Sequence, residues 1–220
     1  LWLVDGKAEK CTLSEAATSF DRVTPTSVWP DLRLSLIGRS QAENALLAMD
    51  VVEGIAERAS WSVDESTVRA ALARVTLPGR YSRYHIHQTT VIVDGAHNPQ
   101  KLEQLFETVR EIYPGKTVEL LLGMASLDHA EAVTEKLKDT SFQVSLANFE
   151  VGDTYTRYHL ADSEAFQRCF KQQGLLIPPL VDDLSALLME RTQGPSPKIL
   201  LICGSFYLVS AALPILDQMC

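Results

Sequence analysis

A short apolar run that ends in an acidic, glycine-containing turn most constrains what this chain can fold into. Residues 91–93 are Val-Ile-Val, a β-branched run that is typical of a buried strand. The turn Asp94-Gly95-Ala96-His97 follows, and then Asn98 and Pro99 predict the N-cap and the first residue of a helix. A strand, a tight turn and a helix in this order favour an open α/β sheet, in which ligands bind at the carboxyl ends of the strands.

From residue 89 onward, the pattern alternates between strand and helix. The predicted strands are 89–93, 117–122, 142–147 and 199–203, and the predicted helices are 99–113, 128–138, 163–173, 184–191 and 207–216. This alternation predicts an α/β fold with a Rossmann-like, doubly wound and mostly parallel sheet. A strand, a turn at Gly204-Ser205 and a helix also explain the uncharged run 199–216 better than a membrane helix does.

The amino-terminal part predicts short strands and connections up to about residue 37, followed by two helices. Gly38-Arg39-Ser40 opens the first helix, and Ser62-Val63-Asp64-Glu65 predicts a capping box for the second. The apolar face expected for the first helix consists of Ala45, Ala48, Met49, Val52, Ile55 and Ala56. The Pro-Gly break at 78–79 leads us to expect two domains, 1–84 and 85–220. Residues 1–5 resemble the interior of a longer polypeptide.

Charge and cysteine content narrow the class of protein. The formal net charge of −8 argues against a surface for duplex nucleic acid, which needs a basic face. Cys11, Cys169, Cys203 and Cys220 are far apart in the sequence and form no Cys-x-x-Cys pair. This spacing predicts neither a zinc site nor a disulfide framework, and it favours reduced thiols in a cytoplasmic protein.

Polar residues near the predicted strand ends are open to more than one interpretation. Asp94 could accept hydrogen bonds from ribose hydroxyls while His97 faces the same ligand, or it could merely cap its own turn. Ser205, at a helix start, could help to bind an anion such as a carboxylate. A Ser205–His97–Asp94 triad is disfavoured, because the acid and the histidine would have to fold back on each other. His85 and His87 are better explained by a solvated edge strand than by a metal site.

Arg80 and Asn44 also have two interpretations each. A lone arginine after a Pro-Gly turn is usually part of a surface ion pair of little energetic worth. Asn44 lies in the first turn of its helix, where its amide could face a base edge or be solvated.

Four strings of residues together resemble folylpolyglutamate synthase/dihydrofolate synthase, in the Mur ligase superfamily. They are Gly38-Arg39-Ser40-Gln41-Ala42-Glu43-Asn44, Leu77-Pro78-Gly79-Arg80, Asp94-Gly95-Ala96-His97-Asn98-Pro99 and Gly204-Ser205-Phe206-Tyr207. Their order and spacing match from about residue 36 onward, and the third string is the most specific. The resemblance implies that residues 1–84 are a helical remnant of a central ATP-binding domain. It implies that residues 85–220 are a Mur ligase C-terminal domain.

The resemblance also implies a reaction and its components. ATP would phosphorylate the carboxylate of a folate-type acid, and the amine of glutamate would attack the acyl phosphate to form an amide bond. Mg²⁺ would be required, with its ligands in a part of the protein that precedes this chain. We expect a cytoplasmic monomer with no nucleic-acid or membrane partner. The alternative is a stand-alone module that binds a nucleotide or an acidic metabolite without catalysis.

Five residues receive roles from this resemblance. Asn44 would contact the adenine and Asp94 the ribose of the nucleotide. Arg80 and His97 would bind the nucleotide and take part in catalysis, with Arg80 at the phosphates. Ser205 would hold the incoming amino acid, and no residue is assigned to a metal.

Two departures from the family pattern affect these expectations. The phosphate loop is absent from this sequence, so we expect the chain alone to be inactive. Leu127-Asp128-His129 stands where family members often carry Asp-Lys-Asp, which leaves the acid substrate open.

Overall fold

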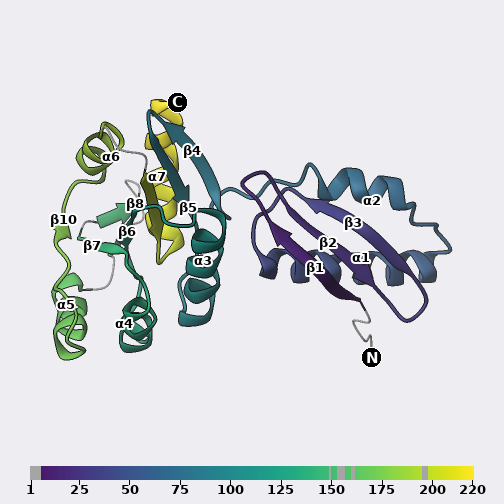
Figure 1. Ribbon diagram of the computed structural model, residues 1–220, viewed down its shortest axis with the longest axis horizontal. Coiled ribbons are helices and arrows are strands. Elements are labelled where there is room, and N and C mark those ends of the chain that lie inside the picture. Colours follow the sequence, from purple (N-terminus) through teal and green to yellow (C-terminus); the bar gives the residue numbers. More distant parts are fainter. Residues whose placement is uncertain (1–5, 149, 153–156, 160–161, 195–197) are drawn as a thin grey trace. The chain divides into compact units, whose positions relative to one another are not determined.

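A computed structural model describes residues 6–148, 150–152, 157–159, 162–194 and 198–220 (Figure 1). The chain divides into two compact units. One extends up to Leu77 and includes Phe106–Tyr113, and the other consists of Pro78–Leu105 and Pro114–Cys220. The division at Leu77 and Pro78 coincides with the predicted Pro-Gly break. The boundary expected between residues 84 and 85 lies instead inside strand β4 (Ser82–Ile86).

The first unit contains a small antiparallel sheet covered by two helices. The sheet has the order β1-β2-β3, and the elements are β1 (Lys7–Leu13), β2 (Thr18–Val23), β3 (Val28–Leu34), α1 (Arg39–Ala59) and α2 (Glu65–Leu72). The predicted short strands before residue 37 are therefore present. Phe20, Leu32 and Leu34 of the sheet pack with Leu46 and Met49 of α1 in a buried cluster.

Helix α1 is apolar on more than one face, and only one of them is buried in the structure. Ala45 and Met49 are buried as predicted. Val52 and Ile55 are 50% and 53% exposed, and Ala48 is also exposed, so this part of the predicted face is wrong. Apolar residues occupy most positions between 45 and 52, and a helical period of 3.6 therefore does not select a single face.

The N-cap of α2 also differs from the prediction. Asp64, not Ser62, occupies the cap position, and its carboxylate accepts a hydrogen bond from the Thr67 N–H at 2.9 Å. Both residue types are good caps, and the ionised carboxylate has the added advantage of favourable interaction with the helix dipole.

A buried ion cluster ties the sheet of the first unit to α1. Arg22 of β2 is only 3% exposed. Its guanidinium donates to Asp50 Oδ1 at 2.7 Å and to Glu53 Oε1 at 2.6 Å, and it lies 5.1 Å from the centre of the Trp29 ring. Two carboxylates and an aromatic face thus compensate for the burial of this charge.

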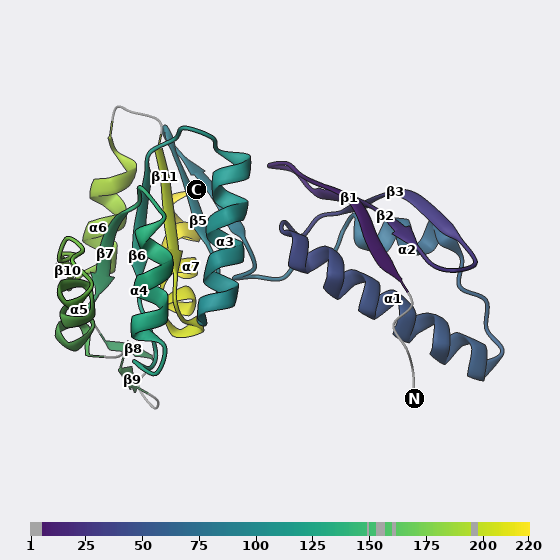
Figure 2. The ribbon, with the colours of Figure 1, turned by 60° about the horizontal axis from the view of Figure 1, so that its bottom comes forward.

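The second unit is built on a six-stranded sheet with helices on both faces (Figure 2). The strand order is β10-β7-β6-β11-β5-β4, and all neighbours are parallel except β4 and β5. The elements from β4 onward are β4, β5 (Thr89–Val93), α3 (Pro99–Ile112), β6 (Val118–Leu122), α4 (Ala130–Lys138), β7 (Gln143–Ala147), β8 (Glu150–Gly152), β9 (Arg157–His159), α5 (Ser163–Gln172), β10 (Leu180–Val181), α6 (Leu184–Thr192), β11 (Lys198–Cys203) and α7 (Phe206–Met219). Of α3, the part from Phe106 onward is assigned to the first unit. The predicted Rossmann-like, mostly parallel sheet is confirmed.

Local signals located most of these elements within one or two residues. Asn98 caps α3 by accepting from the Lys101 N–H at 2.9 Å, and Asp183 caps α6. Helix α4 begins at Ala130, two residues after the predicted start, and His129 holds the N-cap position without a side-chain cap bond. The Asp128 N–H donates to the Ser126 hydroxyl. The short β10, and β8 with β9, were not predicted, and the edge strand β4 was anticipated only through the interpretation of His85 and His87.

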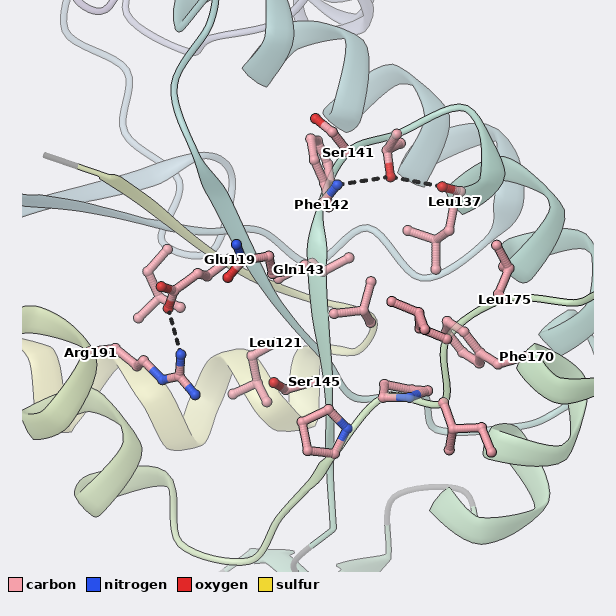
Figure 3. Close-up of a pocket in the computed structure, with 18 of the residues that line it drawn as sticks. Glu119, Leu121, Leu137, Ser141, Phe142, Gln143, Ser145, Phe170, Leu175 and Arg191 are labelled. Atoms are coloured by element: carbon pink, nitrogen blue, oxygen red, sulfur yellow. Dashed lines mark hydrogen bonds and ion pairs between the residues drawn. The ribbon is translucent and has the colours of Figure 1, made fainter. Parts of the chain in front are cut away.

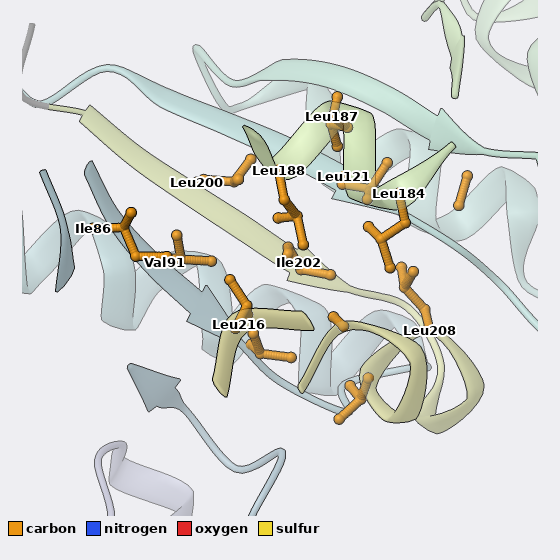
Figure 4. Packing of buried hydrophobic residues seen from close by; sticks show 14 residues of the cluster. Ile86, Val91, Leu121, Leu184, Leu187, Leu188, Leu200, Ile202, Leu208 and Leu216 are labelled. Atoms are coloured by element: carbon orange, nitrogen blue, oxygen red, sulfur yellow. The ribbon is translucent and has the colours of Figure 1, made fainter. Parts of the chain in front are cut away.

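The core on one face of this sheet joins β5, β6 and β11 to α6 and α7. Figure 4 shows Val91, Leu121 and Ile202 from the strands against Leu188 and Leu208 from the helices. The uncharged run 199–216 therefore lies in the central strand β11, the turn after it and α7. Among the described residues, no helix is both long and apolar enough to cross a membrane.

Candidate functional site

The turns after β5 and β11 meet at the carboxyl edge of the six-stranded sheet. The Asp94 N–H donates to the Ile202 carbonyl at 3.0 Å, and the Gly204 N–H donates to the Ala96 carbonyl at 2.8 Å. Because β5 and β11 are parallel neighbours, both turns leave the sheet on the same edge. Arg80, Asp94, His97 and Ser205 are thereby gathered in the second unit, at the edge where α/β sheets bind ligands.

Asp94 uses both carboxylate oxygens to hold backbone groups. Its Oδ2 accepts from the Tyr81 N–H at 2.8 Å and its Oδ1 from the Ala96 N–H at 2.7 Å. Burial raises the pKa of this carboxyl, while the two N–H donors and the charge of Arg80 act in the opposite direction. The geometry provides the capping role considered above, and each oxygen retains a second acceptor position. The ribose contact stays a prediction.

The bond from Asp94 also fixes the backbone next to Arg80. Tyr81 has a φ of 50°, in the left-handed region that is costly for a residue with a Cβ atom. The Asp94 carboxylate holds the N–H of Tyr81 in that conformation. Asp94 therefore controls the path of the chain on which Arg80 lies.

His97 is exposed, and its ring orientation is defined by a backbone contact. Its Nδ1 lies 2.9 Å from the Gly95 carbonyl oxygen. Since a carbonyl can only accept, Nδ1 carries a proton and Nε2 is the nitrogen available to a ligand. A neutral His97 could accept a hydrogen bond there, and a protonated one could donate to a phosphate oxygen.

Ser205 is the N-cap of α7 and is buried. Its Oγ accepts from the Leu208 N–H at 3.2 Å, and the residue is 2% exposed. The preceding Gly204 has a φ of 111°, and a Cβ there would lie 2.9 Å from the backbone of Gly123. The tight turn thus requires glycine, and it turns Ser205 toward its own helix. Contact of Ser205 with an amino-acid substrate stays a prediction.

The arrangement does not form a catalytic triad. Among the described residues, Ser205 bonds to α7, His97 to the Gly95 carbonyl and Asp94 to two backbone N–H groups. The charge relay of a hydrolase needs bonds between these three side chains. The structure therefore contradicts that hypothesis.

Asn44 belongs to the first unit, whereas the other four predicted site residues belong to the second. It is exposed near the start of α1, and its Nδ2 donates weakly to Gln41 Oε1 at 3.4 Å. Its predicted contact with adenine stays a prediction.

The described residues contain no group of three or more His, Cys, Asp or Glu side chains that could hold a metal ion. His85 is exposed on the edge strand β4, with its ring Nδ1 3.2 Å from Thr90 Oγ1. His87 is exposed in the turn that follows. The edge-strand interpretation is therefore confirmed for His85, whereas for His87 it is wrong, because β4 ends at Ile86 and His87 lies in the turn with a φ of 52°.

A cavity of about 550 Å³ lies near the amino ends of β6 and β7 (Figure 3). Pro178 and Pro179, which precede β10, are among the residues that line it. The walls are largely apolar, and Arg191 at the rim is paired with Glu119. The five predicted site residues are not among those that line it.

Sequence reasoning missed one residue of the carboxyl edge, Phe206. The Arg80 guanidinium lies over the Phe206 ring, 4.7 Å from its centre, and the His97 ring centre is 6.4 Å away. Gly79 and Gly95, which have no side chains, both lie near this ring, but that nearness is visible only in the structure.

Fold and site together define a Rossmann-like domain with an arginine and a histidine at the carboxyl edge of its sheet. The family described as Mur ligase, glutamate ligase domain matches residues 79–206. The chain therefore belongs to the Mur ligase family.

The relatives include folate enzymes. The chain is similar to dihydrofolate synthase/folylpolyglutamate synthase of Bacillus subtilis, with 25% identity over 196 residues, 89% of this chain and 43% of the relative. The Mycobacterium tuberculosis enzyme of the same name is 41% identical over 83 residues, 37% of this chain and 17% of its own. A solved structure of Mycobacterium tuberculosis folylpolyglutamate synthase complexed with ADP and AMPPCP shares the fold. It has a TM-score of 0.76 and 22% identity, and the match covers 96% of this chain and 48% of that one.

Proposed function

We propose that this chain is the C-terminal part of an ATP-dependent ligase that joins a folate-type acid to glutamate. The observation that carries the proposal is the string Asp94–Pro99 on a strand-turn-helix in a domain of the glutamate ligase family. The chain spans 43% of the Bacillus subtilis relative, so the first unit would be the remnant of a longer ATP-binding domain. The reaction would proceed through an acyl phosphate, which glutamate attacks to form the amide.

Arg80 is the residue we assign to the nucleotide phosphates, and His97 would lie against the same nucleotide. A transferred phosphoryl group develops charge on its oxygens, and positioned cations stabilise that charge. Arg80 is always protonated, and Nε2 of His97 is directed away from its backbone contact. Asp94 would contact the ribose, Asn44 the adenine and Ser205 the glutamate.

Among the described residues, the turns after β5 and β11 offer magnesium no suitable ligand set. Asp94 is the acid of the turn, and both of its oxygens already accept backbone N–H groups. Mg²⁺ requires octahedral oxygen ligands, usually including carboxylates, waters and substrate phosphates. We therefore assign the magnesium ligands to the part of the protein outside this chain. We further propose a cytoplasmic monomer, consistent with a net charge of −8 and four free cysteines.

The decisive experiment is an activity assay of the full-length protein that contains this chain. It is supplied with ATP and glutamate and with either dihydropteroate or tetrahydrofolate as the acid. Amide product with either acid supports the proposal, and the preferred acid shows whether first or later glutamates are added. Absence of product with both acids from a folded protein contradicts it.

Calorimetry with ATP on the 220-residue chain tests the alternative of a stand-alone binding module. The ligase proposal predicts weak binding and no turnover, because the phosphate loop is absent from this sequence. Tight ATP binding by this chain alone would instead favour the binding module.

A further inference from the structure

Phe206 joins the three sequence strings that meet at the carboxyl edge. It is the first residue of α7, and 42% of it is exposed. Its ring contacts the Pro78-Gly79-Arg80 turn on one side and the Gly95-Ala96-His97 turn on another. Phe206 is therefore not part of the buried core of the sheet.

The Phe206 ring fills the space that a side chain on Gly95 would occupy. A Cβ on Gly95 would lie 2.4 Å, 2.5 Å and 2.8 Å from three atoms of this ring. The φ angle of Gly95 is not positive, so the backbone conformation at this position does not by itself require glycine. The ring itself is therefore what excludes a side chain at this position.

Gly79 borders the same ring. A Cβ there would lie 3.5 Å from Phe206 Cε1 and 2.6 Å from Val209 Cγ1. The Gly95 N–H donates to the Gly79 carbonyl at 2.8 Å. Two glycine backbones are thus bonded to each other and packed against one aromatic ring.

Arg80 takes its direction from this ring. Its guanidinium lies 4.7 Å from the ring centre, within the range of a cation–π interaction. Arginine has a long side chain that loses rotamer entropy when it is fixed in one direction. Stacking restricts that freedom before a ligand arrives, and a pre-ordered guanidinium binds an anion more tightly.

We propose that Phe206 is a positioning residue that orients Arg80 toward the phosphates of the nucleotide. This inference rests on the proposed function, since it requires that Arg80 binds phosphate. The same arrangement requires glycine at position 95, because a side chain there would displace the Phe206 ring.

Side-chain NMR of the 220-residue chain tests the geometry without any activity. Protons over an aromatic ring are shifted upfield, so Phe206→Leu should move the Arg80 Nε–H signal downfield. Phe206→Tyr should restore it. Trp61→Leu is the matched control, because it removes an exposed ring from the first unit. An Arg80 signal that is the same in Phe206→Leu and in the wild type overturns the proposal.

A double-variant comparison tests the role of Gly95. Gly95→Ala should displace the ring and move the Arg80 signal by itself. The same change made in Phe206→Leu should have a smaller effect, because the flexible leucine can move aside. Equal effects in the two backgrounds would contradict the coupling.

Kinetics of the full-length protein complete the test. Phe206→Leu should raise the KM for ATP by roughly 3- to 10-fold, the range of a cation–π contact, with recovery in Phe206→Tyr. An active wild type whose ATP kinetics are unchanged by Phe206→Leu overturns the positioning role.

An inactive wild type contradicts the proposed function instead. In that case the Arg80 signal, titrated with inorganic triphosphate in wild type and Phe206→Leu, still decides the positioning role: a shift that is weaker in the variant supports it, and equal or absent shifts overturn it.

Discussion

Replacing Asp94 with alanine should destabilise the second unit by about 2–4 kcal/mol. The change removes the acceptors of two backbone N–H groups, those of Tyr81 and Ala96, which belong to residues only 5% and 2% exposed. Leaving a buried donor unsatisfied costs about 1–3 kcal/mol. Two such donors together would cost about 2–6 kcal/mol. The lower part of this range applies here because water can reach part of the space that the Asp94 side chain occupies.

The free energy of unfolding from urea titration of the 220-residue chain measures this cost. Asp128→Ala is the matched control, because Asp128 is exposed and its side chain caps no helix. Asp94→Asn should fall between wild type and Asp94→Ala, since an amide retains one acceptor oxygen. An Asp94→Ala stability within about 0.5 kcal/mol of the wild type would refute the view that this carboxylate holds the turn.

The same variant separates the structural role of Asp94 from the predicted ribose contact. In the full-length protein, loss of a ribose hydrogen bond should raise the KM for ATP by roughly 3- to 10-fold. The measurement is made well below the unfolding temperature of the variant, so that the folded fraction is the same. An unchanged KM would contradict the ribose contact. Asp94 would then serve only to hold the turn.

Three further predictions concern single side chains. Ser205→Ala removes the cap of α7 and should lower the free energy of unfolding by about 1 kcal/mol, measured by urea titration, and an unchanged value would refute the cap. Burial, and after it the bond to Asp217 at 2.9 Å, raise the pKa of Tyr84 to about 12. The folded state therefore holds this proton longer than the unfolded state, and stability should fall as pH rises from about 10 to about 12, a loss that is absent in Tyr84→Phe. Arg22→Met leaves two partly buried carboxylates without their cation and should cost about 3–5 kcal/mol in thermal or urea unfolding, and a loss under 1 kcal/mol would contradict this account.

Local signals were sufficient where several of them agreed. Residues 89–93 form a strand and Pro99 begins a helix, as predicted, because the β-branched run, the Asn98 cap and the proline all specify the same boundary. At the start of α2 two good caps lie two residues apart, and the sequence alone does not rank Ser62 against Asp64. The geometry of the turn before α2 decides which of the two side chains accepts the hydrogen bond from the first turn of the helix.

The buried face of α1 was harder to predict for a different reason. A helix with apolar residues on several sides contains no internal signal for which side a sheet will cover. Met49 faces the three-stranded sheet, whereas Val52, three residues later, is half exposed. Such a choice is made by tertiary packing, which a single-helix pattern does not contain.

In the candidate site, the sequence predicts where the residues lie better than it predicts what their side chains contact. Parallel neighbouring strands deliver their following turns to one edge, so the gathering of Asp94, His97 and Ser205 follows from the alternation of strands and helices. What each side chain does there depends on which backbone groups need partners. Asp94 and Ser205 satisfy N–H groups of their own turns, whereas His97 keeps Nε2 for a ligand. Arg80 differs from all three, because its direction comes from an aromatic ring 126 positions later in the chain, which no local pattern around Arg80 contains.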